Sequence, residues 1–539
     1  MSTTSNSNKH IPADGLAGLK ENFSQDALSG FLVFLLALPL SLGIAKASDF
    51  PAIFGLVTAI IGGVVVSFFA GSRLSIKGPA AGLIVICSGA IAAFGGGEQG
   101  WHLALGAVVV AGVIQILFGV FKLGKLADFF PSAAIHGMLA AIGIIIMSKQ
   151  IHTLLGINPA LLKGKEPLEL LAMIPESIMH ENAHIAEIGI SCLVILILFS
   201  FVKNKKLKKI PAPLVVLLVA IPFGIILHVK TEGTVANFAL VKVGSIFDAF
   251  KNGIFNVDFS GVSSHTGVFV EYVILFALIG SLESLLTAKA IDLVDPFNRK
   301  SDFNKDLVAV GIGNTLSGLL GGLPMISEVA RSSANVTNGA RTRWANFWHG
   351  LFLLVAILFA VPLIEMIPNA ALAAMLIYVG FRLAHPREFK HMLHIGVDQL
   401  VIFVVTIIMT LATDLLIGVG SGILMEFIFI TISGARPKNF FTSRVAVKKE
   451  ENTITATVTG DALFSNYLGL KKTLNGLEKG KSLTIDLSEC KLIDHTTLHS
   501  LHGFRNDYEM EGGHVMIKEH TAHRSKGNAP TSTKVLKMN

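Results

Sequence analysis

The chain has 539 residues, of which 52% are hydrophobic and only 15% are charged, and its formal net charge is +7. Soluble domains carry about 25% charged residues, so this composition excludes an ordinary soluble protein. The positive charge does not indicate nucleic-acid binding, because the Lys and Arg residues lie between apolar runs, as membrane topology requires. Three scattered cysteines supply neither a disulfide framework nor a metal-binding spacing.

Long apolar runs recur from Ala27 to Ser433 with short polar breaks. A run of about 20 apolar residues crosses a bilayer as a helix. The polar stretch before the first run lacks the apolar region of a signal peptide. The pattern predicts fourteen membrane spans, at 27–47, 52–70, 78–96, 101–121, 129–148, 184–202, 211–228, 267–290, 305–321, 325–337, 344–366, 369–383, 398–416 and 417–434.

The loops between these spans predict the topology. Loops after even-numbered spans are rich in Lys and Arg, as in VKNKKLKKIP, whereas the short loops after odd-numbered spans contain neither residue. Basic loops remain on the cytoplasmic side. We therefore expect a multi-pass protein of a bacterial inner membrane with both termini, and the loop Lys203–Lys209, in the cytoplasm.

The composition changes after Gly434. ENTITATVTG alternates like a strand, KSLTIDLSEC reads as a second strand, DHTTLHSLHGFRNDYEMEGG as a helix, and GHVMIKEH as a third strand. This order indicates a small α/β domain. The predicted organisation is a cytoplasmic N-terminal segment (1–24), a transmembrane domain (25–434), a linker (435–447), an α/β domain (448–523) and a disordered tail (524–539).

Two predicted spans are short and interrupted by Gly and Pro. The third begins SIKGPAAGLIVICSGAI, and the tenth, MISEVARSSANV, follows GLLGGLP. Matched interruptions in the two halves of a chain mark the binding site of inverted-repeat transporters. A helix that begins inside the membrane exposes free N–H groups and its positive dipole end, which bind anions. For a single segment, kinking or tight helix packing would be the better interpretation, but the matched pair favours a site.

The eighth span carries an acidic residue deep within its apolar run. Glu283 lies in YVILFALIGSLESLLTAKAIDLV, and Thr287 lies four residues later on the same helix face. A carboxylate at this depth is costly unless it faces a cavity or a partner. It can be protonated, or it can be ionised beside a cation. A structural ion pair is the alternative, and we favour a functional role.

The tenth span adds Glu328 and Arg331, three residues apart. They could pair with each other, or Arg331 could face an anion while Glu328 binds a cation; the sequence leaves both possibilities open. Three histidines near span ends are expected to be interfacial or packing residues: His136, His349 and His385.

These segments together resemble the SulP family of inorganic anion transporters along nearly the whole chain. The segments DALSGFLVFLLALPLSLGIAKAS, FPSAAIHGMLAAIGIIIM, LESLLTAKAIDLV and NKDLVAVGIGNTLSGLLGGLP are similar to the family's first, fifth, eighth and ninth spans. The tail, through LTIDLSECKLIDHTTLHSL, is similar to a STAS domain. The shared order of these motifs carries the resemblance.

The resemblance implies fourteen spans in two inverted repeats of seven, divided into core and gate domains, a homodimer and elevator-like alternating access. It implies a transporter rather than an enzyme, with no cofactor. The anion would lie between the half-helix starts, near residues carried over from the family: Pro79, Ala80, Ala81, Gly82, Ser327, Glu328, Val329, Ala330 and Arg331, with Pro39, Leu40 and Ser41 of the first span. Glu283 and Thr287 match the pair that helps to hold the cation in sodium-coupled bicarbonate members.

The chain departs from the family pattern at three of these positions. Leu40 replaces a frequent Gln, Ala330 a frequent Ser, and Glu328 a small neutral residue. The anion therefore stays open between bicarbonate, sulfate and a dicarboxylate, and the coupling ion between sodium and a proton. A channel or exchanger of the same fold is the main rival. A membrane enzyme is disfavoured because no nucleophile–base pair is present, and a nucleobase transporter because of Arg331 and the STAS-like tail.

The start of the helix in the STAS-like domain raises a regulatory question. In stand-alone STAS proteins a Ser at this place can be phosphorylated, and here the stretch is Asp494, His495, Thr496, Thr497. Thr496 is a candidate for such a switch. A Thr at a helix start is more often a plain N-cap, and we favour that interpretation.

Overall fold

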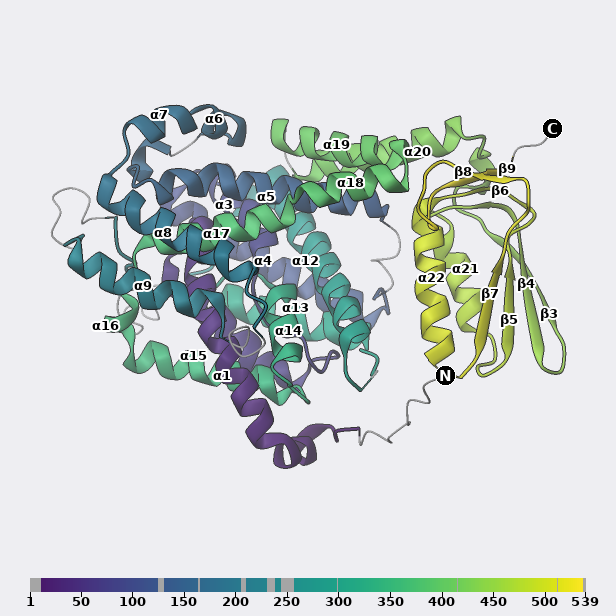
Figure 1. Ribbon diagram of the computed structural model, residues 1–539, viewed down its shortest axis with the longest axis horizontal. Coiled ribbons are helices and arrows are strands. Elements are labelled where there is room, and N and C mark those ends of the chain that lie inside the picture. Colours follow the sequence, from purple (N-terminus) through teal and green to yellow (C-terminus); the bar gives the residue numbers. More distant parts are fainter. Residues whose placement is uncertain are drawn as a thin grey trace. The chain divides into compact units, whose positions relative to one another are not determined.

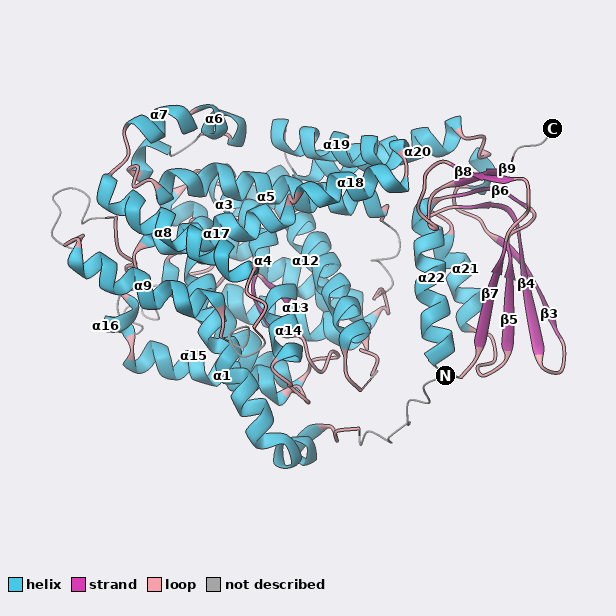
Figure 2. Ribbon diagram, in the orientation of Figure 1, coloured by secondary structure: helices cyan, strands magenta, loops and turns pink. Residues whose placement is uncertain are grey.

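The computed structural model describes residues 11–124, 130–162, 165–204, 210–229, 238–243, 256–297, 299–413, 415–510 and 512–536. Helices dominate as far as Ile432, and most strands follow residue 443 (Figures 1 and 2). Most of the basic loop Lys203–Lys209, namely residues 205–209, lies outside the described residues.

The α-helices before the C-terminal domain are α1 (Gly15–Ala47), α2 (Ala52–Ile60), α3 (Ile84–Ala93), α4 (Gly97–Val120), α5 (Ser132–Leu154), α6 (Pro167–Ala172), α7 (Ile174–Met179), α8 (Ala183–Ser200), α9 (Ala212–Ile226), α11 (Gly261–Ser264), α12 (Thr266–Val294), α13 (Phe303–Leu319), α14 (Val329–Thr337), α15 (Trp344–Phe359), α16 (Val361–Ile364), α17 (Asn369–Leu383), α18 (Pro386–Ile395), α19 (Val397–Ala412) and α20 (Leu415–Ile432). In the described part of the chain, six helices are long and apolar enough to cross a membrane, and five apolar helices are shorter. The predicted helical membrane architecture is thereby confirmed, while the count of fourteen spans stays a prediction.

The two interrupted spans each consist of a short strand followed by a helix. Strand β1 (Ile76–Pro79) leads through a 3-10 turn into α3, and β2 (Met325–Glu328) leads directly into α14. The strands pair antiparallel, with Ile76 opposite Glu328 and Pro79 opposite Met325. Backbone polar groups inside a membrane need internal partners. The strand pair meets this need where the helices are interrupted.

Side chains from neighbouring helices complete the hydrogen bonding of this strand pair. Asn314 of α13 accepts a bond from the Met325 amide (2.6 Å) and donates one to the Met325 carbonyl (3.2 Å). The Ile76 amide donates to the Ser332 hydroxyl of α14 at 2.9 Å. A two-stranded sheet has two free edges, and these side chains satisfy edge groups that water cannot reach.

Asp306, near the start of α13, joins several of these elements. Its carboxylate oxygens accept hydrogen bonds from the Lys77 ammonium group, with Nζ 2.9 Å from Oδ1 and 3.2 Å from Oδ2. Both side chains are almost fully buried. The same carboxylate accepts bonds from the amides of Gly71 and Ser72 and from the Ser327 hydroxyl. Asp306 therefore fixes β1, β2 and the segment before β1 against α13.

The chain divides into two compact units, Met1–Gly124 with Gly143–Phe381, and Lys125–Ile142 with Arg382–Asn539. The second unit includes α18 to α20, so this division does not coincide with the domain boundary predicted at residue 434. Hydrogen bonds explain why. The Thr496 hydroxyl accepts a bond from the Ser132 amide at the start of α5 (3.1 Å). The Asn528 amide donates to the His394 carbonyl of α18 (2.9 Å).

The C-terminal domain contains a mixed sheet whose strands follow the order β7-β5-β4-β6-β9-β8, with β3 paired to β4. Helices α21 and α22 lie along one face of the sheet (Figure 2). Its elements are β3 (Arg444–Lys449), β4 (Thr453–Ala462), α21 (Tyr467–Asn475), β5 (Ser482–Asp486), β6 (Cys490–Ile493), α22 (His495–Met510), β7 (His514–Lys518), β8 (His523–Ser525) and β9 (Lys534–Leu536). Burial alternates along most of β4, as its sequence pattern predicts.

Two predictions for this domain are wrong. Residues 524–536 were assigned to a disordered tail, but β9 pairs with β6, where Val535 lies opposite Leu492, and β8 pairs with β9. Ladder hydrogen bonds compensate for the polar composition of this segment. Thr496 is not the N-cap of α22, because the Asp494 carboxylate accepts the bond from the Thr497 amide (2.7 Å). The Thr496 hydroxyl accepts from the start of α5 instead.

We predict that Lys77→Met lowers the stability of the folded protein by about 3–5 kcal/mol, because it leaves the buried Asp306 carboxylate without its counter-charge. Thermal unfolding in detergent measures this loss. The double variant Lys77→Met/Asp306→Asn should recover part of it, because the amide carries no charge. Lys149→Met, which removes a partly exposed ion pair with Asp49, should change little. Equal effects of the two Lys variants would contradict the structural role of the buried pair.

Candidate functional site

The Glu283 carboxylate, on α12, packs against the start of the first half-helix. A Cβ atom added at Gly82, in the 3-10 turn that leads into α3, would overlap both carboxylate oxygens of Glu283. Glu283 lies on α12, is only 8% exposed, and its Oε1 atom has no hydrogen-bond partner among the described residues. An acidic group therefore lies against the helix start that was expected to bind an anion.

The start of the second half-helix carries the Glu328 carboxylate. Glu328 is the N-cap of α14, and its Oε2 atom accepts a bond from the Arg331 amide at 2.6 Å. An acid at this place satisfies an N–H group and interacts well with the helix dipole. Both helix starts are thus associated with carboxylates.

Arg331 is the single cation among the predicted site residues. Its side chain is fully buried and reaches back from α14 to β1, where Nη2 donates to the Pro79 carbonyl at 3.2 Å. Its Nε atom lies 4.0 Å from Oε2 of Glu328, at the outer limit of an ion pair. The Nε and Nη1 atoms have no hydrogen-bond partner within the described chain. Glu328 thus pairs only loosely with Arg331, and two guanidinium donors stay available.

Gly78 provides the space for the guanidinium group. A Cβ atom at this position of β1 would lie 2.5 Å from Nη1 of Arg331. The glycine lies directly before Pro79, whose carbonyl accepts the arginine bond. The short strand β1 therefore accepts a hydrogen bond from the Arg331 guanidinium group and also leaves the space that this group occupies.

The other predicted residues near the strand pair differ in how deeply they are buried. Ala80, Gly82, Ser327 and Thr287 are buried near the strand ends or on α12, while Ala81 and Ala330 are partly buried. Ser327 is tied to α12, because its amide donates to the Ser284 hydroxyl at 3.3 Å. The Val329 side chain is 52% exposed, which places it away from the buried cluster.

The first-span residues Pro39, Leu40 and Ser41 lie in helix α1, after its kink at Asn22, and α1 contacts β1, α3 and α14. Ser41 is fully buried, and its hydroxyl has no hydrogen-bond partner among the described residues. Leu40 instead belongs to an apolar cluster with residues of α8, α9 and α17. The apolar side chain of Leu40 suits these apolar neighbours. Ser41 is therefore the one residue of the three with a polar side chain.

Two residues close to this cluster, Lys77 and Asp306, were not predicted from the sequence. Lys77 and Asp306 form the buried pair that anchors β1, and a charge directly before the Gly-Pro interruption was the available signal. His349, predicted to be an interfacial or packing residue, is fully buried on α15.

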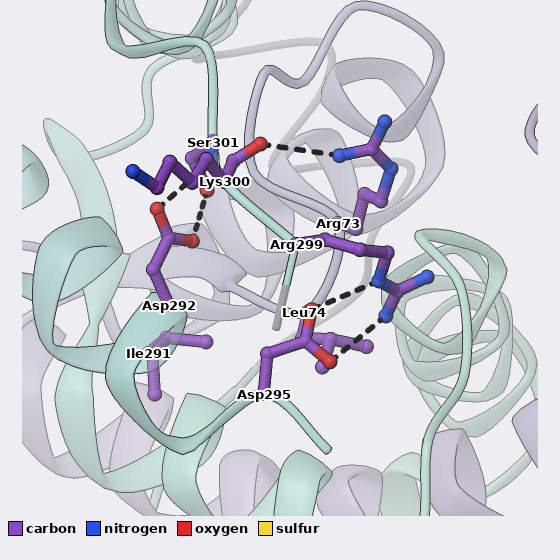
Figure 3. Close-up of a pocket in the computed structure, with 8 residues that line it drawn as sticks. All are labelled: Arg73, Leu74, Ile291, Asp292, Asp295, Arg299, Lys300 and Ser301. Atoms are coloured by element: carbon purple, nitrogen blue, oxygen red, sulfur yellow. Dashed lines mark hydrogen bonds and ion pairs between the residues drawn. The ribbon is translucent and has the colours of Figure 1, made fainter. Parts of the chain in front are cut away.

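A separate polar pocket lies at the far end of α12 (Figure 3). Arg299 is bonded to Asp295 at 2.8 Å, and the Ser301 hydroxyl donates to Asp292 at 2.6 Å. Asp292 follows Glu283 by nine residues, which is about 13 Å along a helix. Arg299 pairs with Asp295, Asp292 bonds Ser301, and Arg73 pairs with Asp14 outside the pocket, so we assign the pocket a structural role.

The model of the sulfate permease family matches residues 23–406 of the chain, which include both half-helices, α12 and α15. The chain belongs to the sulfate permease family. Its C-terminal β-rich region is consistent with the STAS domain predicted from the sequence. The family consists of multi-pass membrane transporters of sulfate and bicarbonate, and this sulfate permease chain shares their fold.

Relatives and solved structures agree with the assignment. A putative sulfate transporter of Bacillus subtilis, YvdB, is 28% identical over 92% of this chain and 91% of its own length. The bicarbonate transporter BicA of Picosynechococcus is 28% identical over 81% of this chain and 75% of its own. The transmembrane domain of a cyanobacterial BicA superposes with a TM-score of 0.63 and 24% identity, covering 75% of this chain and 97% of that one. SLC26A9 superposes with a TM-score of 0.64 and 14% identity, over 93% and 84%.

We predict that Gly78→Ala weakens anion binding at least tenfold, because the added methyl group must displace the Arg331 guanidinium. Arg331→Ala should weaken binding at least as much while the fold is retained. Binding of labelled anion to purified protein measures both effects. Gly43→Ala on α1 is the control, because its methyl group would meet neighbours at an ordinary 3.5 Å. Wild-type affinity in the Arg331→Ala variant would show that this cation only supports the fold.

Proposed function

We propose that this sulfate permease chain is a secondary active transporter that carries a small inorganic anion, bicarbonate or sulfate, together with a cation. The observation that carries the proposal is the buried Glu283 carboxylate against Gly82, at a helix start that would otherwise bind an anion. Relatives named as sulfate and as bicarbonate transporters support both substrates.

The charge balance of the site explains why a cation is needed. Lys77 and Asp306 neutralise each other. Glu283, Glu328 and Arg331 then leave one net negative charge when all three are ionised. A substrate anion would add further negative charge in a region from which water is excluded, and such charge is costly there. A sodium ion or a proton at Glu283 offsets this charge and makes anion binding depend on the cation.

The identity of the cation follows from the ligands that it would meet. A proton needs only the Glu283 carboxylate. Sodium is a hard cation that prefers oxygen ligands, which Glu283 could supply together with the hydroxyl of Thr287, buried one turn away on α12, and the carboxylate of Glu328. We favour sodium because several oxygen atoms are available. The anion would then contact Arg331 and the free backbone N–H groups of the half-helix starts.

The transport cycle that we propose is elevator-like alternating access in a homodimer, in the inner membrane with both termini cytoplasmic. The strand pair β1–β2, α3, α12, α13 and α14 are tied together by hydrogen bonds and packing, which supports movement of this part of the fold with its anion and cation as one body. The STAS-like domain would then act on the rate or on assembly.

The test is uptake into proteoliposomes of labelled bicarbonate, sulfate and succinate, with a sodium gradient, with a pH gradient, and with neither. We expect bicarbonate or sulfate to accumulate under one of the cation gradients. Accumulation of succinate alone would indicate a dicarboxylate transporter, and equilibration without accumulation would indicate an uncoupled pathway. Either outcome would contradict the proposal.

We predict that Glu283→Gln abolishes gradient-driven accumulation but retains exchange of labelled for unlabelled anion, because the amide mimics the neutral acid and cannot release a proton or attract sodium. Glu426→Gln is the matched control, because Glu426 is also a buried membrane acid but bonds Gln399 in the other compact unit. Full response of Glu283→Gln to the gradient that drives the wild type would refute the coupling role.

A further inference from the structure

A cleft of about 460 Å³ lies on the first compact unit, away from the half-helix starts. Four segment ends form it, namely the end of the helical segment 52–68, the end of α4, the start of α13 and the start of α15. Its lining residues are Phe68, Phe69, Gly119, Val120, Lys122, Asp302, Asn304, Lys305, Val308 and Arg343. Its volume falls within the range of ligand pockets.

The cleft combines excess positive charge with exposed apolar side chains. Lys122 and Lys305 are exposed, and Arg343 is partly buried and lies 3.5 Å from Asp14. Asp302 is the one acidic lining residue, and its carboxylate already accepts two backbone bonds at the start of α13. Because Arg343 forms an ion pair with Asp14, Lys122 and Lys305 supply the remaining positive charge of the cleft, and Asp302 is the single acidic lining residue beside them.

The apolar side of the cleft has the character of a membrane boundary. Phe68, Phe69 and Val120 are 54%, 49% and 60% exposed. Phe68 packs edge-on against Trp344 at a centroid distance of 5.4 Å, and the Trp344 indole donates to the Gly15 carbonyl. Trp344 itself is only 6% exposed, so the exposed apolar surface of the cleft consists of Phe68, Phe69 and Val120. The positive-inside pattern assigns these segment ends to the cytoplasmic side.

We propose that this cleft binds the headgroup of an anionic phospholipid of the cytoplasmic leaflet. The phosphate would interact with Lys122 and Lys305, with Arg343 as a third cation, while the acyl chains would lie along Phe68, Phe69 and Val120. Basic pockets between membrane helices on the cytoplasmic side favour such headgroups, and each basic residue adds attraction to anionic lipid. A free phosphate ion would use the same cations but gain nothing from the exposed apolar surface.

The proposal gives α13 a second role. Lys305, which lines the cleft, is followed directly by Asp306, which holds Lys77 and the strand pair. A lipid bound at Lys305 would therefore restrain the first turn of the helix that anchors the anion site. The proposal does not depend on which anion is transported, because its test reads lipid binding.

The experiment uses the purified full-length chain in neutral detergent. Native mass spectrometry counts bound phosphatidylglycerol and phosphatidylcholine in competition, and thermal unfolding measures the stabilisation by each lipid and by inorganic phosphate. We expect the wild type to prefer phosphatidylglycerol at least tenfold and to be stabilised by it more than by phosphate. The variant Lys122→Gln/Lys305→Gln should lose this preference while its unfolding temperature in phosphatidylcholine stays unchanged.

The control Lys20→Gln/Lys472→Gln removes the same charge from exposed positions outside the cleft and should retain the preference. The single variant Lys122→Gln repeats the test should the double variant not fold, with an expected loss of several-fold. Equal binding of both lipids by the wild type, an unaltered preference in the cleft variants, or equal stabilisation by inorganic phosphate would each overturn the proposal.

Discussion

The pairing of β1 with β2 is the interaction on which the rest of this structure depends. Two helices begin within the membrane region, and their interrupted backbones need hydrogen-bond partners there. Four residues of each strand supply partners for one another, and Asn314 and Ser332 bond the groups that face outward. Only this arrangement allows α3 and α14 to begin side by side with the same supporting helices, and thus to present two helix starts to one region.

Charge determines how that region can be used. Most buried charges near the strands are neutralised locally, since Asp306 has Lys77 and several donors. Glu283 and Arg331 are the exceptions, because one oxygen of Glu283 and two nitrogens of Arg331 have no hydrogen-bond partner within the described chain. Membrane proteins retain such costly groups where an ion must bind. The packing of the Glu283 carboxylate against Gly82 would therefore bring the proposed anion site and the proposed cation site together in one place.

The sequence predicted the helical membrane fold, the interrupted spans and three of the seven strands described in the C-terminal domain (β4, β5 and β7), because apolar length, Gly/Pro spacing and alternation are local signals. It did not predict contacts between distant residues, such as Gly82 with Glu283 or Lys77 with Asp306, since no pattern joins positions that far apart. The strands β8 and β9 were missed because a polar segment can be ordered by ladder bonds alone. Leu40, which stands where the family often has a polar residue, packs with apolar neighbours, and its place near the anion stays a prediction.

Helix α13 contacts both the strand pair β1–β2 and the basic cleft. Its residues Asn314 and Asp306 hold β2 and β1, while Lys305 and Asn304 line the basic cleft at its start. Successive helix residues lie about 100° apart around the axis, so Lys305 can face the cleft while Asp306 faces the buried Lys77. One helix thus carries both the anchor of the half-helix starts and part of the cleft that we propose to bind lipid. Any force on its first turn acts on the buried ion pair, and through that pair on the geometry of both half-helix starts.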